Sequence, residues 1–300
     1  MDYDAPRAVI GIGSNAVRML TARVFCGALS NEKRYRVDVR MFSGLAEGKL
    51  TTEMISRVTE AVKLMKAEAA ADEASAIDLI ATSAARDAEN SDELAQRIQR
   101  ETGLVMRVLD GEEEARFGYY GATAGMKGRC GMVDIGGGST EIAIGDLGEP
   151  EEQVSMQLGS SRLGKDMKYK PESVLKALAF MVDGARDTME VELPKEWVGV
   201  GGTLHTLARI SLNGERYVEG ASLSRDSVES IAYTLNGMTV EQCASVPGIL
   251  ASRADIVEAG AWIALAIMRS MRIEQMTVTE RNNMDGFLIE MEKKMGYSLR

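Results

Sequence analysis

Apolar and polar positions follow the same arrangement in two distant parts of the chain. Residues 9–24 and residues 132–144 each contain an apolar run, a polar turn with glycine, and a second apolar run. Two apolar runs joined by such a turn predict a β-hairpin. The arrangement occurs only twice, so it predicts two related domains that each open with a hairpin, and it excludes a solenoid of many repeats.

Strand and helix patterns alternate in the rest of the chain. Ile55, Val58 and Val62 recur at helical spacing behind Thr51, whereas residues 77–81 form a short apolar run typical of a strand. Further strands are predicted at 104–109, 154–158, 197–200 and 276–279, and further helices at 91–102, from 112, and at 171–189, 224–235, 240–244, 254–271 and 285–294. Strands that alternate with helices predict an α/β fold.

Charge and composition exclude several classes of function. The chain has 35 Lys and Arg against 45 Asp and Glu, a net charge of −10, which argues against a DNA-binding protein or one that binds anionic membranes. The longest apolar run, 259–268, is too short to span a bilayer. His205 is the only histidine, which excludes metal sites built from several histidines.

Three cysteines without a CxxC pair indicate neither a disulfide framework nor a cysteine zinc site. The first residues also lack the basic start and long apolar core of a signal peptide. Together these features predict a cytoplasmic protein.

The glycine turns are the main chemical signal. Glycines leave main-chain N–H groups unobstructed, and hydroxyls beside them add donors, which is what binding of phosphate oxygens requires. Such turns occur at Gly13, Ser14 and Asn15, at Gly136, Gly137, Gly138, Ser139 and Thr140, and at Gly201, Gly202 and Thr203. One glycine-rich turn is weak evidence, but three after predicted strands favour a phosphate-binding protein.

Acidic residues flank the second turn. Asp134 precedes it and Glu141 follows it, so both can reach a cation beside bound phosphate, and such hard oxygen ligands suit Mg²⁺. The position equivalent to Asp134 in the first hairpin is Gly11, which has no side-chain ligand. Three carboxylates, including Glu114, open the helix after Gly111, where the helix dipole alone would favour them. Arg86 has a comparable explanation as an ion-pair partner at a helix start.

Taken together, these motifs resemble those of one known family. They are IGIGSN at 10–15, TSAARDAEN at 82–90, GEEEAR at 111–116, VDIGGGSTE at 133–141 and GVGGT at 199–203. In this order and over most of the chain they resemble the exopolyphosphatase and guanosine pentaphosphate phosphohydrolase (Ppx/GppA) phosphatase family.

The resemblance implies the actin-like ATPase superfold, with two ribonuclease-H-like lobes and an active site in the cleft between them. The lobes would be 1–122 and 123–282, with a C-terminal helix in 283–300 completing the first. It also implies hydrolysis of the terminal phosphate of inorganic polyphosphate or of guanosine pentaphosphate (pppGpp), with Mg²⁺ or Mn²⁺ as the cofactor, and it suggests a homodimer. By position in the motifs, the catalytic glutamate falls on Glu114, the arginine after Thr-Ser on Arg86, the metal-associated acids on Asp134 and Glu141, and the phosphate loops on the glycine turns.

The chain departs from the family pattern at two places. Family members usually carry aspartate, a residue that helps hold the cation, where this chain has Gly11. Residues 281–286, Arg-Asn-Asn-Met-Asp-Gly, stand in place of a glycine-leucine-arginine-glutamate-glycine pattern. The absence of the first aspartate motivates an alternative: a catalytically weak sensor that binds polyphosphate or an alarmone without turnover.

Substrate choice is left open by the residues. A polyanion needs a positive track leading from the cleft, and the densest cationic group in the second half is Arg162, Lys165, Lys168 and Lys170, beside Lys127 and Arg129. A solvated basic face is the alternative interpretation of this group. The short architecture favours polyphosphate over pppGpp. The turn at 201–203 also resembles nucleotide-contacting loops of kinases, so an ATP-dependent phosphotransferase is a further alternative.

Overall fold

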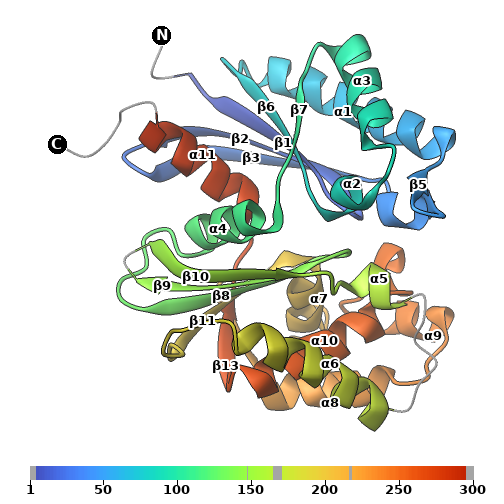
Figure 1. The fold of residues 1–300 in the computed structure, drawn as a ribbon, viewed down its shortest axis with the longest axis vertical. Coiled ribbons are helices and arrows are strands. Elements are labelled where there is room, and N and C mark those ends of the chain that lie inside the picture. The colour runs from blue at the N-terminus through green and yellow to red at the C-terminus, as the bar shows by residue number, and fades with distance from the viewer. Residues whose placement is uncertain (1–4, 147, 165–170, 216–217, 295–300) are drawn as a thin grey trace. The chain divides into compact units, whose positions relative to one another are not determined.

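The computed structural model describes residues 5–146, 148–164, 171–215 and 218–294. The chain divides into two compact units, of which unit 1 is Met1–Gly125 with Asn283–Arg300 and unit 2 is Met126–Asn282 (Figure 1). The boundary expected from the sequence repeat, between 122 and 123, lies a few residues before this division.

Unit 1 contains one five-stranded sheet in the order β3-β2-β1-β6-β7. Strands β1, β2 and β3 form an antiparallel meander, and β6 and β7 continue the sheet parallel to β1. The strands are β1 (Arg7–Ile12), β2 (Ala16–Phe25), β3 (Ala28–Asp38), β6 (Ile77–Ala81) and β7 (Met106–Val108), with a small separate pair β4 (Leu45–Ala46) and β5 (Lys49–Leu50). The helices are α1 (Thr52–Ala71), α2 (Ser83–Asp87), α3 (Ser91–Thr102), α4 (Gly111–Ala122) and α11 (Asn283–Lys294), with a 3₁₀ turn η1 at Met41–Gly44.

Alternation along β1 explains why unit 1 has helices on both faces of its sheet. Ala8, Ile10 and Ile12 pack with apolar residues of α1 and α3 in one cluster. Val9 packs with Phe117 of α4 and with residues of α11 in another. Because successive side chains of a strand point to opposite faces, a central strand with no polar face requires cover on both sides.

The C-terminal helix α11 is held to unit 1 by buried contacts. Phe287 packs edge-on against Phe117 of α4, with ring centroids 5.4 Å apart. A side chain at Gly286 would overlap the main chain of Phe117, so glycine allows the two helices to approach closely. Asp285 is fully buried and accepts two hydrogen bonds from Arg34 of β3, at 2.6 and 3.0 Å. The last helix therefore belongs to the first unit although 157 residues of unit 2 separate them in sequence.

Unit 2 repeats this strand order. Its sheet runs β10-β9-β8-β11-β13-β12, so a meander of three antiparallel strands is again followed by two parallel ones, and β12 is added at the edge. The strands are β8 (Cys130–Ile135), β9 (Thr140–Asp146), β10 (Glu149–Met156), β11 (Glu196–Val200), β12 (Ala221–Ser224) and β13 (Gln275–Val278). The helices are α5 (Ser160–Gly164), α6 (Pro171–Arg186), α7 (Gly201–Ser211), α8 (Arg225–Leu235), α9 (Val240–Ser245) and α10 (Val257–Ser270), with a 3₁₀ turn η2 at Ala251–Arg253.

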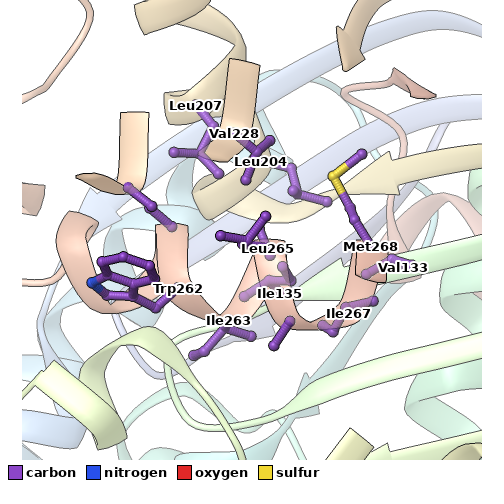
Figure 2. Close-up of a cluster of buried hydrophobic side chains, with 14 of the residues drawn as sticks. Val133, Ile135, Leu204, Leu207, Val228, Trp262, Ile263, Leu265, Ile267 and Met268 are labelled. Carbon is purple, nitrogen blue, oxygen red and sulfur yellow. The ribbon is translucent and has the colours of Figure 1, made fainter. Parts of the chain in front are cut away.

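Helix α10 is the centre of the unit 2 core. Figure 2 shows Trp262, Leu265 and Met268 of this helix among side chains from β8, α7 and α8. Twelve of its fourteen residues are buried, which explains the long apolar run in the sequence. In the described part of the chain, no helix combines the length and apolarity needed to cross a bilayer.

Both predicted hairpins are present as β1–β2 and β8–β9. The predicted helix at 254–271 is shorter, because a 3₁₀ turn and an irregular segment precede α10. Strand β3 was not predicted from the sequence. Its side chains from Asn31 to Arg34 are all exposed or charged, so it lacks the apolar alternation of a half-buried strand.

Candidate active site

The candidate residues of unit 1 lie where its parallel strands end. The turn at Gly13 follows β1, Thr82 follows β6, and Leu109 follows β7. Two main-chain hydrogen bonds, from Thr82 N–H to Ile12 O and from Leu109 N–H to Ala81 O, connect these ends. Binding sites of α/β proteins form at this carboxyl edge of the sheet, where loops and helix N-termini meet.

Glu114 and Arg86, the two predicted catalytic residues, are in contact. Arg86 Nη1 lies 3.2 Å from Glu114 Oε2 and also donates a hydrogen bond to Leu109 O at 2.7 Å. Glu114 is 9% exposed, so its carboxylate is largely desolvated beside the guanidinium. The resulting pair combines a carboxylate that can accept a proton with a cation that can bind phosphate.

The three neighbouring glutamates of α4 differ in what they contact. Glu113 closes a capping box with Asp110 and forms an ion pair with Arg107. Glu112 is exposed. Helix-start electrostatics therefore account for Glu113, whereas only Glu114 contacts Arg86 at the carboxyl edge.

In unit 2, Asp134 and Glu141 are opposite each other on β8 and β9. Directly opposed residues of antiparallel strands project to the same face, so the two carboxylates are neighbours. Glu141 is 1% exposed and accepts a hydrogen bond from Ser155 Oγ at 2.7 Å. Asp134 is half-buried and lies against Gly201, where a side chain would overlap its carboxylate. Gly201 has φ +88°, so glycine is required there for its backbone as well as for space.

These carboxylates suit a divalent cation in kind and number. Mg²⁺ in proteins is usually bound by one or two carboxylates together with substrate phosphate and water. Asp134 and Glu141 provide two carboxylates, and the described residues contain no group of three or more His, Cys, Asp or Glu arranged to hold a metal ion. These two carboxylates therefore fit an Mg²⁺ ion that is bound by the protein and by substrate phosphate together.

Arg253 is a site residue that the sequence did not predict. It is 7% exposed, and its Nη2 lies 3.4 Å from Thr203 Oγ1. Its guanidinium packs directly on Gly202, where a side chain would overlap it. Glycine at 201 thus leaves room for the carboxylate of Asp134, and glycine at 202 leaves room for a buried cation. The second glycine of the turn was the signal, but it does not say which side chain fills the space.

The two departures from the family pattern lie together in unit 1. A Cβ at Gly11 would be 3.2 Å from Sδ of Met284, which belongs to the second departing segment, 281–286. The space beside the first glycine turn that a longer side chain at 11 would enter is therefore filled by a thioether from α11.

The predicted cationic group is wrong in part. Arg129 precedes β8 and so lies at the opposite end of that strand from Gly136, where it forms an ion pair with Glu151 at 2.6 Å. Lys127 precedes β8 too, and Lys165, Lys168 and Lys170 fall outside the described residues. Arg162 does lie at the second turn, with Nε 2.8 Å from Gly138 O.

His205 lies in α7, and its Nε2 is 2.6 Å from Thr279 O. This contact ties α7 to the end of β13 and is a structural role.

Comparisons with known proteins give the family and the fold of the chain. The model of the Ppx/GppA phosphatase family matches residues 27–295. Exopolyphosphatase 2 of Mycobacterium tuberculosis is 30% identical over 95% of this chain and 98% of that protein. Guanosine-5'-triphosphate,3'-diphosphate pyrophosphatase of Photobacterium profundum is 28% identical over 96% of this chain and 59% of that protein. Among solved structures, the Ppx/GppA family member of Aquifex aeolicus has a TM-score of 0.83 and 25% identity, covering 98% of this chain and 99% of that one. An exopolyphosphatase from Cytophaga hutchinsonii has a TM-score of 0.86 at 20% identity and covers 98% of this chain and all of that one, which supports the fold alone.

Proposed function

Because the chain belongs to the Ppx/GppA phosphatase family and is a hydrolase acting on phosphoanhydrides, we propose that it removes the terminal phosphate of inorganic polyphosphate. The observation that carries this proposal is the contact between Arg86 and Glu114 at the carboxyl edge of the unit 1 sheet. We take polyphosphate rather than pppGpp as the first candidate substrate because exopolyphosphatase 2 is 30% identical to this chain and the pppGpp-hydrolysing relative is 28% identical.

In the proposed mechanism, unit 1 supplies the base and a cation. The guanidinium of Arg86 binds an oxygen of the terminal phosphate, and the carboxylate of Glu114 orients a water molecule and accepts its proton as the water attacks phosphorus. The P–O bond to the rest of the polyphosphate breaks, and the shortened chain leaves with the bridging oxygen. The N–H groups of Ser14 and Asn15 bind phosphate oxygens at the first turn. Fixed donors of this kind stabilise the charge of the transition state without reorganising, which is the main source of rate enhancement in phosphoryl transfer.

In unit 2 we propose a second set of ligands for phosphate and for the cation. The N–H groups of Gly137, Gly138 and Ser139 bind phosphate oxygens. The predicted hydroxyl donor Thr140 is not part of this set, because it is fully buried and its hydroxyl donates to Leu158 O at 2.6 Å. Asp134 and Glu141 would hold Mg²⁺, which when bound supplies positive charge against the substrate oxygens. Arg253, buried against Gly202 and Thr203, adds a fixed cation that the sequence had not suggested.

The test is phosphate release from medium-chain polyphosphate by wild type, Glu114→Gln and Glu113→Gln. Glu113 is a matched control because it is the preceding residue of the same helix turn and pairs with Arg107 instead. We expect Glu114→Gln to lose about 10²- to 10⁴-fold in kcat, the usual contribution of a general base, and Glu113→Gln to retain activity. Equal losses in the two variants would reject Glu114 as the base.

The same assay with pppGpp, with Mg²⁺, Mn²⁺ or EDTA, decides among the other functions. Faster release from pppGpp would make the chain a pentaphosphate hydrolase. Tight binding of polyphosphate with no release under any metal would indicate the sensor motivated by Gly11. Turnover of ATP only with an acceptor present would indicate a phosphotransferase.

A further inference from the structure

The second glycine turn is held from one side by the segment that follows β10. Gly136 O accepts the N–H of Ser160 at 3.0 Å, and Gly137 O accepts the N–H groups of Ser161 and Arg162 at 2.8 and 3.0 Å. Gly138 O accepts Nε–H of Arg162 at 2.8 Å. Three successive carbonyls of the turn are thus bound by residues 160–162, which we call the carbonyl clamp.

Because the peptide bond is planar, the hydrogen bonds to these carbonyls also fix the direction of the N–H groups in the turn. In a trans peptide the C=O of one residue and the N–H of the next point in opposite directions. With the carbonyls of Gly136, Gly137 and Gly138 directed at the clamp, the N–H groups of Gly137, Gly138 and Ser139 must face away from it. Within the described residues none of these three N–H groups donates to a main-chain carbonyl. The clamp therefore presents three donors on the side where an anion would bind.

The clamp approaches the turn closely because Gly159 lacks a side chain. A Cβ at Gly159 would overlap the carbonyl of Gly137. At this point main chain packs directly on main chain, and a side chain at position 159 would push the clamp away from the turn.

Unit 1 contains the same device at the equivalent place in its topology. The segment after β3 donates to the first turn: Ser14 O accepts the N–H of Phe42 at 2.9 Å, and Asn15 O accepts those of Val39 and Arg40 at 3.0 and 2.8 Å. Arg40 has the left-handed backbone, with φ 53° and ψ 46°. In each unit, therefore, the chain leaves the third strand of the meander and passes behind the glycine turn.

We propose that Arg162 is a positioning residue, whose Nε–H orients the Gly138–Ser139 peptide so that the turn can bind a phosphate group of the substrate. The proposal rests on the proposed function for the identity of the anion. In this role the hydrogen bond from Nε of Arg162 is required for phosphate binding and its positive charge is not. If Arg162 instead contacted polyphosphate directly as a cation, the charge would be required.

Three substitutions separate the donor from the charge. In Arg162→Gln the amide nitrogen occupies the place of Nε along the side chain, so a donor remains without the charge. In Arg162→Lys a methylene occupies that place, so the charge remains without the donor. Arg162→Ala removes both. We expect kcat/KM for polyphosphate to be near wild type for Gln and to fall about tenfold for Lys and Ala, the effect typical of one lost hydrogen bond.

A measurement of binding alone tests the role of Arg162 independently of the proposed hydrolysis. Calorimetric titration of the same three variants in a Glu114→Gln background with tripolyphosphate should give the same order, with melting temperatures equal to that of the parent. If wild type releases no phosphate from polyphosphate, the proposed function fails while the order of tripolyphosphate affinities still tests the clamp. If the Ala variant does not fold, the comparison of Gln with Lys decides.

Retained affinity for Lys with loss for Gln would show that the charge matters and would overturn the proposal. Equal affinity in all three variants, or equal loss in all three, would overturn it as well, since neither pattern depends on the donor at Nε.

Discussion

Substitution of Asp285 by Asn should destabilise unit 1 far more than loss of a surface charge would. Asp285 is fully buried at the start of α11, and both its oxygens accept hydrogen bonds from Arg34, at 2.6 and 3.0 Å. Burial alone would lower the pKa of Arg34, but the hydrogen bonds and charge of Asp285, with those of Glu32, raise it above its ordinary value. The pair therefore contributes to attaching the last helix to the β1–β3 meander.

Removal of one partner of a buried ion pair typically costs 3–5 kcal/mol. The side chain of Arg34 is 28% exposed and keeps Glu32 as a partner, so the guanidinium is not left unpaired and the expected loss is smaller, about 2–3 kcal/mol. For units of this size such a loss lowers the melting temperature by about 5–10 °C.

The assay is thermal and urea unfolding of wild type, Asp285→Asn and Glu229→Gln. Glu229 pairs with Arg269 at 2.7 Å, but both side chains are more than a third exposed, so this control should lose no more than about 0.5–1 kcal/mol. An Asp285→Asn variant as stable as the control would refute the reasoning that the buried pair holds α11 in place.

Three further outcomes follow from particular contacts. Gly201→Ala should lose about 1–2 kcal/mol of stability from its φ of +88°, and more from overlap with Asp134. Gly220→Ala, with φ +74° and open space around it, should lose only the amount due to φ. Equal melting temperatures of the two variants would contradict this. Asp72→Asn should remove more stability at pH 7 than at pH values below 3.8. Burial alone would raise the pKa of Asp72, but hydrogen bonds from Lys33 and Tyr35 outweigh burial and hold the pKa below 3.8. The carboxylate therefore contributes to the free energy of unfolding above pH 3.8, and this contribution is lost as the pH falls through the lower pKa of the folded state. A destabilisation by Asp72→Asn that does not change with pH would contradict this. Gly11→Asp should cost about 1–3 kcal/mol of stability by crowding Met284, and the same substitution should cost less in a Met284→Ala background. If unfolding experiments give the same cost in both backgrounds, the contact is contradicted.

The sequence predicted the elements that have a strong apolar period and the turns that glycine marks. The hairpins β1–β2 and β8–β9 and the buried helix α10 are in this class. Strand β3 was missed because its exposed, charged side chains carry no period, and it is instead held by main-chain pairing with β2 along its length. Local patterns report which face of an element is buried, and β3 has almost no buried face.

The candidate site could be predicted as a set of motifs but not as a set of contacts. Glu113 and Glu114 are adjacent and chemically identical in the sequence, yet one caps a helix and the other meets Arg86. Arg253 lies 50 residues from Thr203 in the chain and was invisible as a partner of that turn. Arg129 was grouped with Arg162 in the sequence, but it precedes β8 and pairs with Glu151, because proximity in sequence does not say which end of a strand a side chain occupies.

The contact between Gly11 and Met284 changes how the departures from the family pattern are interpreted. Considered alone, Gly11 is a position without a carboxylate, and Met284 lies in the separate segment 281–286, 273 residues away in the chain. In the fold they touch, with the thioether filling the volume beside a residue that has no side chain. An acid at position 11 would be placed against this thioether, on the face that position 11 shares with Arg18, its direct partner on β2. The two departures are therefore best understood as one packing change in unit 1, which leaves Asp134 and Glu141 of unit 2 as the carboxylates proposed to hold the cation.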